Sequence, residues 1–240
     1  MATRNLLYKR SYAINDSIKI SIPLVRDILD NDNEDNYYSL VSVLTAMPID
    51  MMVQLDEAGI DFTSINDYEL FLLMFDGIKS QDTSLIFGDL DLTKFNIAIN
   101  EQNGTVVLLD SENNITIDRA IHSQIAGILR IIHHLEKNRR KPANPEAKEF
   151  LLERAKAKIK RRKNRTEDSQ LESLIIAMVN AEPYKYDFEG TRELSIYQFN
   201  ESVRQVIKKV DYNNRMYGVY TGTINVKELS QDDLNWLAHK

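Results

Sequence analysis

The sequence predicts an α+β protein that is mainly helical, with an acidic N-terminal helical unit, a small antiparallel β-hairpin layer and long helices in the C-terminal half. Glycine (8) and proline (5) are scarce among 240 residues, which favours long helices over frequent tight turns. Apolar residues recur at three- and four-residue spacings along much of the chain, as on one face of a helix. The clearest strand signal is the stretch 95–110, where two apolar runs flank Asn103-Gly104, a dipeptide that suits a type I′ hairpin turn.

The N-terminal part begins with a predicted strand over 6–22, because Ser17 to Ile22 alternates polar and apolar residues. Asn15-Asp16 is the expected turn before the alternating stretch, and a short helix over 24–29 is expected after Pro23. The helices expected next are 37–46, capped by Asn36; 49–58, with Pro48 in its first turn and Gly59 as its stop; and 67–75, begun by a capping box over 64–67.

After the hairpin, a third strand is expected at 115–117, and Asp118 is expected to cap a helix that runs to about 137. The segment 141–145 contains two prolines and is the best candidate for a linker. It separates a predicted N-terminal α+β domain, residues 1–140, from a C-terminal helical region, residues 141–240. The elements expected in that region are a basic helix over 145–163 capped by Asn144, a helix from 166–168 to just before Pro183, a helix over 195–210, a strand or glycine-bent loop over 217–224 and a terminal turn from 230–233.

The charge of the chain is sorted by position. Residues 137–165 contain 13 Lys/Arg and three acids, whereas residues 27–91 contain 15 Asp/Glu and one base, although the whole chain carries a net charge of only -6. Charge blocks of this kind report on partners more than on fold. The candidate binding residues in the basic block are Lys156, Lys160, Arg161, Arg162, Lys163 and Arg165.

Two readings of the basic block stay open. It could be an arm that binds nucleic-acid phosphates, with salt-dependent affinity. It could equally be a solvated helix or one that docks on an acidic protein surface. There is no aromatic residue between Phe150 and Tyr184 on which a base could stack, and no reading-helix motif is present. Protein docking is therefore the leading interpretation, and nucleic-acid binding through 137–165 is the alternative.

No motif predicts an enzyme. The chain has no cysteine, no Gly-x-Ser-x-Gly elbow and no glycine-rich loop followed by Lys-Ser/Thr. The nearest carboxylate pairs are Asp89/Asp91 and Asp232/Asp233, and neither has a neighbouring nucleophile in sequence. We therefore expect no catalytic residue, no cofactor and no small-molecule substrate.

Metal binding is not predicted either. The acidic stretches 30–34 and 110–114 resemble oxygen-ligand loops, but both lack the glycine at position six and the glutamate at position twelve of a calcium-binding EF-hand. We expect turns there. His133 and His134 are adjacent on the predicted helix and point about 100° apart, which does not suit a shared zinc ion.

The C-terminal third is rich in aromatic residues. Tyr and Trp are favoured in protein interfaces because one end of the side chain is apolar and the other can stay in contact with water. Tyr217, Tyr220 and Trp236 are therefore candidate partner-binding residues, whereas Phe199 is expected to lie in the core.

The run from Tyr197 to Tyr212, continued through Arg215–Ile224 to Asp233–Leu237, resembles phage and prophage proteins of Gram-positive bacteria that come from virion-assembly regions. The segment Gly59–Thr63 into Asp67–Phe71 is similar to phage tail-assembly chaperones. Neither family defines catalytic or ligand residues, so none is carried over.

The resemblance implies a non-enzymatic tail or baseplate morphogenesis protein, structural or a chaperone. Its partners would be other phage tail or baseplate proteins or further copies of itself. Its location would be the bacterial host cytoplasm during assembly, and whether it stays in the virion is left open. A membrane role is not expected, since the longest apolar run, Leu70–Phe75, is far shorter than the ~20 residues that span a bilayer.

Overall fold

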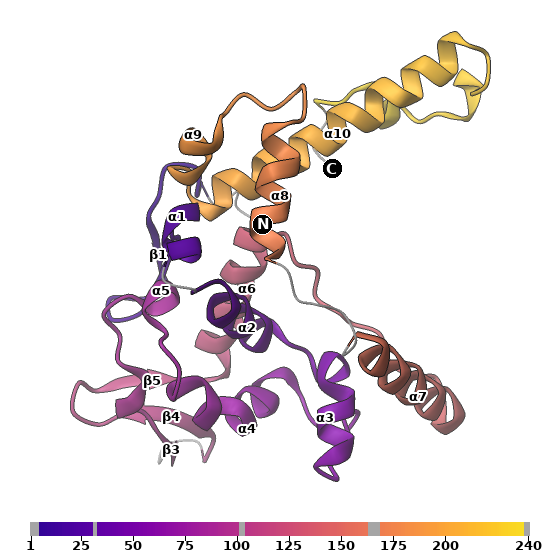
Figure 1. The fold of residues 1–240 in the computed structure, drawn as a ribbon. Coiled ribbons are helices and arrows are strands. Elements are labelled where there is room, and N and C mark those ends of the chain that lie inside the picture. The colour runs from indigo at the N-terminus through magenta and orange to yellow at the C-terminus, as the bar shows by residue number, and fades with distance from the viewer. Residues whose placement is uncertain (1–4, 31–32, 101–103, 163–168, 238–240) are drawn as a thin grey trace.

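The computed structural model describes residues 5–30, 33–100, 104–162 and 169–237. The protein is mainly helical with two small antiparallel sheets, which confirms the predicted fold class (Figure 1). The helices are α1 (Val25–Leu29), α2 (Asn33–Thr45), α3 (Met52–Glu57), α4 (Asp67–Lys79), α5 (Ser84–Phe87), α6 (Arg119–His133), α7 (Pro145–Arg162), α8 (Gln170–Val179), α9 (Phe188–Arg192) and α10 (Ile196–Tyr220). The described residues also form the 3-10 helices η2 (Pro48–Met51), η3 (Leu92–Lys94), η4 (Val226–Glu228) and η5 (Gln231–Leu234).

The N-terminal strand signal covers two strands joined by a turn. β1 (Ser11–Ala13) and β2 (Lys19–Ser21) pair antiparallel, with Tyr12 opposite Ile20. The Asn15 side-chain oxygen accepts hydrogen bonds from the backbone N–H groups of Ser17 (3.0 Å) and Ile18 (2.7 Å), which closes the turn. The expected turn at Asn15-Asp16 is thus confirmed, and the strand signal over 6–22 is confined to two short strands, one on each side of it.

The predicted hairpin and its third strand are confirmed. β3 (Asn96–Ile99) pairs antiparallel with β4 (Val106–Asp110), and β4 pairs with β5 (Ile115–Ile117). The type I′ turn at Asn103-Gly104 was wrong, because Ile99 pairs with Val106 and the Asn100 N–H bonds to the Thr105 carbonyl, which leaves four residues, 101–104, between the strands. Residues 101–103 lie outside the described residues, and Gly104 has a φ of 68°.

Helix α6 is central to the core. The Asp118 side chain accepts a hydrogen bond from the Ile121 backbone N–H at 2.8 Å, so the predicted cap is confirmed. The helix ends at His133 and not near 137, because His134 adopts a left-handed conformation with φ 52° and the Leu135 N–H turns back to the Arg130 carbonyl. Residues after 134 are thereby free to run along the acidic helices as an irregular segment.

Two other helix starts differ from those predicted. α2 begins at Asn33, three or four residues before the expected start, and Asn36 donates its side-chain amide to the Asp82 carbonyl (2.7 Å) instead of capping. At α4 the cap is Asn66, which accepts from the backbone of Tyr68 and Glu69, while Glu69 bonds back to the Asn66 N–H. The capping box exists there, two residues later than predicted.

The last α-helix, α10, is longer than expected. α10 starts where predicted, with Ser195 as its N-cap, but the helix continues ten residues beyond 210, so Tyr217–Tyr220 forms its last turn and not a strand. The chain then bends at Gly222, with φ 75°. α8 starts at Gln170 behind a Ser169 cap, and the expected start at 166–168 lies outside the described residues.

One hydrophobic core joins segments from both halves of the sequence. Phe95, Ile128 and Ile132 pack in the same buried cluster as Ile175 and Phe199. The domain boundary near residue 140 stays a prediction. In Figure 1, α7 and the far half of α10 project from this core in different directions. Among the described residues, no helix combines the length and apolar character needed to cross a membrane.

Candidate functional site

The basic segment folds onto the acidic segment of the same chain. Asn144 caps α7, since its side-chain oxygen accepts from the Ala147 N–H at 2.8 Å, and Pro145 takes the first helical position. This start directs α7 along α3 (Figure 1). Three ion pairs follow, each between the basic and the acidic segment: Lys137–Asp67 at 2.7 Å, Lys148–Asp61 at 2.7 Å and Lys156–Asp56 at 2.6 Å.

These contacts hold the paired groups in their charged forms. The hydrogen bond from Lys148, with those from Thr63, lowers the pKa of Asp61 to about 2. The hydrogen bond to Asp56 raises the pKa of Lys156 above its usual range. Lys156, a candidate partner-binding residue, is thus engaged with its own chain.

The outer end of α7 has no such partners. Lys158, Lys160 and Arg161 are exposed and form no ion pair within the described part of the chain. Arg162 is the last residue of α7, and the predicted site residues Lys163 and Arg165 lie outside the described residues.

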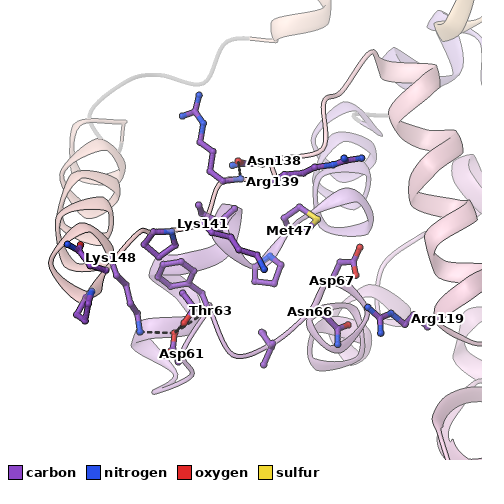
Figure 2. A pocket seen from close by; sticks show the side chains of 18 residues that line it. Met47, Asp61, Thr63, Asn66, Asp67, Arg119, Asn138, Arg139, Lys141 and Lys148 are labelled. Carbon is purple, nitrogen blue, oxygen red and sulfur yellow. Dashed lines mark hydrogen bonds and ion pairs between the residues drawn. The ribbon is translucent and has the colours of Figure 1, made fainter.

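A groove lies where the basic segment crosses the acidic helices, and Figure 2 shows it from close by. It has a volume of about 600 Å³. Its lining comes from residues 47–49, the loop 61–67, Arg119 at the start of α6, and the segment 138–148. In Figure 2 the Lys148–Asp61 pair stands at one end and Arg119 at the other, beside Asn66 and Asp67.

The far half of α10 presents large side chains to solvent. Tyr217 is 71% exposed and Tyr220 86% exposed, and Ile207 and Val210 are exposed on the same helix. At 100° per residue, Ile207, Val210 and Tyr217 continue the stripe that Phe199 begins in the core. The apolar face of α10 is therefore covered at its inner end and open at its outer end.

Trp236 differs from the two tyrosines because it packs inward. The C-terminal segment returns along α10, where Arg215 pairs with Asp233 at 3.0 Å. The Lys209 ammonium lies 4.5 Å from the centre of the Trp236 ring, a cation–π contact. Trp236 thus holds the returning segment on α10, which is a structural contact within the chain.

Of the acidic loops considered for calcium, 110–114 forms a turn as expected, whereas Asn33 and Glu34 of 30–34 lie in the first turn of α2. Asp110 is buried at the end of β4, and its carboxylate accepts hydrogen bonds from the Glu112 and Asn113 backbone and from the Asn113 side chain. The Asn113 side chain contributes most to lowering the pKa of Asp110. Asp91 caps η3 by accepting from Thr93. Residues 31 and 32 of the other loop lie outside the described residues.

His122 is buried in the core, and His133 is half-buried at the end of α6. His133 Nε2 lies 3.0 Å from the Tyr37 hydroxyl, and the His122 ring stacks on Phe71 with centroids 4.4 Å apart. Burial lowers the pKa of both imidazoles to about 4. Within the described residues, no group of three or more His, Asp or Glu side chains could hold a metal ion.

Sequence reasoning missed the groove. The run Arg139-Arg140-Lys141 was visible as part of the basic block, but nothing in the sequence placed it beside Arg119 or Phe62. The one usable signal was charge: an acidic and a basic block in one chain can pair with each other, which is what Asp56, Asp61 and Asp67 do.

The comparisons with known proteins give a match only for the C-terminal third of the chain. Residues 160–239, which span α8 to η5, match the family model described as YomV second domain, from a phage-type protein family. No curated protein and no solved structure matches the chain. The match bears out the similarity of the last third to phage proteins and carries no sign of tail assembly. The chain is thus similar, over the segment that carries α10, to a bacteriophage-related domain, and this is consistent with a phage protein.

Proposed function

We propose that the chain is a non-enzymatic phage morphogenesis protein, a tail or baseplate assembly factor or chaperone, that binds other phage proteins through the far half of α10. The observation that carries this proposal is the open end of the apolar stripe, where Tyr217 and Tyr220 are 71% and 86% exposed. They lie in the segment that matches the phage-type domain family.

The side chains and the rigid support of the far half of α10 favour binding to a partner. Tyrosines are enriched at interface centres because they bring a large apolar surface at a small cost in side-chain entropy. The inner end of α10 is fixed, since Phe199 is fully buried and Ser195 caps the helix. The Arg215–Asp233 pair braces its outer half. A surface already held in place loses less entropy on binding than a mobile one.

We expect the double substitution Tyr217→Ser/Tyr220→Ser to remove the protein from its assembly complex without unfolding it. Mass spectrometry of purified particles and of assembly intermediates from the encoding phage measures the copy number of the protein. Truncating two exposed aromatic anchors should lower co-purification at least tenfold, because such anchors supply most of the binding energy of an interface.

The matched control is Tyr8→Ser, because Tyr8 is equally exposed, at 85%, and lies in the N-terminal segment. It should leave co-purification unchanged. Absence of the wild-type protein from particles and intermediates alike, despite its expression, would contradict the proposal. A fixed copy number in particles would indicate a structural component, and presence in intermediates alone would indicate a chaperone.

Nucleic-acid binding through 137–165 is the second candidate, favoured by the unpaired bases Lys158, Lys160 and Arg161 at the outer end of α7. It requires binding to duplex or single-stranded DNA or RNA that weakens steeply with salt. Under this alternative, changing the bases of 156–165 to glutamine abolishes that binding and leaves assembly intact. Undetectable binding of the unmodified protein at low salt would exclude it.

A further inference from the structure

The groove between the basic segment and the acidic helices has an apolar floor. Met47, Pro48, Ile49, Phe62 and Ile65 form the apolar part of its lining. Phe62 and Ile49 belong to a small hydrophobic cluster that also contains Leu70 of α4. Because the floor belongs to a packed cluster, it is a preformed surface. Its volume of about 600 Å³ falls in the usual range for ligand pockets.

The rim of the groove carries an excess of positive charge. Its two acids are already engaged, Asp61 with Lys148 and Asp67 with Lys137, each at 2.7 Å. Four further cations line the groove and have no ion-pair partner among the described residues: Arg119, Arg139, Arg140 and Lys141. These four unpaired cations therefore line a hollow in which the carboxylates of Asp61 and Asp67 are already neutralised.

An anionic ligand with an apolar part fits this arrangement, and the residues of the groove favour carboxylates as its anionic groups. Guanidinium groups hold carboxylates through two parallel hydrogen bonds, and three of the four free cations are arginines. The one aromatic ring in the floor, Phe62, is only 5% exposed, with the Lys148 ammonium 5.6 Å from its centre. A nucleic-acid base would have no open ring on which to stack.

The surroundings also disfavour a long phosphate backbone. Asp50 and Glu57 lie on η2 and α3, the elements next to the groove, and would repel phosphates that run past the basic rim. A short acidic peptide would contact the rim without crossing these acids.

We propose that the groove binds a short acidic segment of a partner protein, with one aliphatic side chain on the apolar floor and carboxylates on Arg119, Arg139 and Arg140. This surface is separate from the far half of α10. The inference therefore does not rest on the proposed function, and either can fail alone.

The test measures binding of a fluorescein-labelled peptide of sequence Glu-Asp-Leu-Asp-Glu to the full chain. Fluorescence anisotropy gives the affinity at 50 and at 150 mM salt. The triple substitution Arg139→Gln/Arg140→Gln/Lys141→Gln should weaken binding at least tenfold, and Arg119→Gln alone should weaken it severalfold. The matched control, Lys158→Gln/Lys160→Gln/Arg161→Gln, removes the same charge from the outer end of α7 and should change the affinity less than twofold. A peptide with serine in place of leucine should bind more weakly than the parent.

Three results would overturn the proposal. Equal losses in the two triple variants would show general attraction between charges. The groove would be assigned to nucleic acid if a single-stranded DNA of the same net charge bound more tightly than the peptide and if this DNA binding disappeared in the groove variant. Dimerisation that disappears in the groove variant on size-exclusion chromatography would make a second copy of the chain the occupant. The substituted residues are exposed, so circular dichroism should show an unchanged fold in every variant.

Discussion

Replacing Phe199 by alanine should lower the free energy of unfolding by about 3–5 kcal/mol. Phe199 is fully buried one turn into α10, where this helix packs against α6. Removal of its ring leaves a cavity in the core and also weakens the packing at the base of α10, whose far half projects from the core. Urea unfolding followed by circular dichroism measures the change, with the slope against urea expected to stay constant.

Tyr217→Ala is the matched control on the same helix. It deletes an aromatic side chain of similar size that is 71% exposed, so the free energy of unfolding should change by at most about 0.5 kcal/mol. A similar loss in both variants would mean that the outer half of α10 is packed as firmly as its base. That result would also weaken the case for the arm as a binding surface.

The parts of the fold that the sequence predicted well depend on neighbouring residues. Asp118 caps α6 and Asn144-Pro145 starts α7, because an N-cap bonds to the backbone two or three residues ahead. The hairpin 95–110 follows from two apolar runs with a short polar stretch between them, although the turn dipeptide did not predict the length of the connection. These signals are local, and a sequence displays them directly.

The ends of long helices depend on packing and were predicted less well. α6 stops at His133, where the His133 ring contacts Tyr37 and the next residue turns left-handed. α10 continues past Val210 because the returning C-terminal segment packs along it, with Trp236 under Lys209. Tyr37 and Trp236 are both more than one helical turn away in sequence from the helix end that they influence. The periodicity of apolar residues therefore could not predict where these helices end.

The site was predictable only in its charge. The sequence displayed an acidic and a basic block but not their pairing, because the partners lie far apart, as in the case of Lys156 and Asp56. The segment after α6 is irregular, which lets Lys137 reach Asp67 and brings Arg139 to the groove. A contact of this kind requires the path of the chain in space.

Acid should destabilise the protein strongly between pH 7 and pH 5, and His122 and His133 are the main cause. Burial lowers the pKa of His122 and of His133 to about 4, against about 6.5 in the unfolded chain. For His122 the nearby Asp67 opposes this shift, while Arg130 and Lys137 add to it. Below pH 6.5 the unfolded chain takes up protons that the folded chain does not. The stabilisation is therefore present above pH 6.5 and is lost as the pH falls toward 4.

From these pKa values, each histidine should cost about 2 kcal/mol between pH 7 and pH 5. Urea unfolding at the two pH values measures the total, which should approach about 4 kcal/mol for the unmodified protein. His122→Phe removes one of the two titrations and keeps a ring stacked on Phe71, so its loss over the same range should be about half as large. The carboxylates Asp61 and Asp67 have pKa values below the ordinary range, and they add to the loss only at lower pH. If His122→Phe keeps the full pH dependence, the histidine is already protonated or solvated in the folded protein, and the packing of α6 against α4 must be looser than its stacked rings indicate.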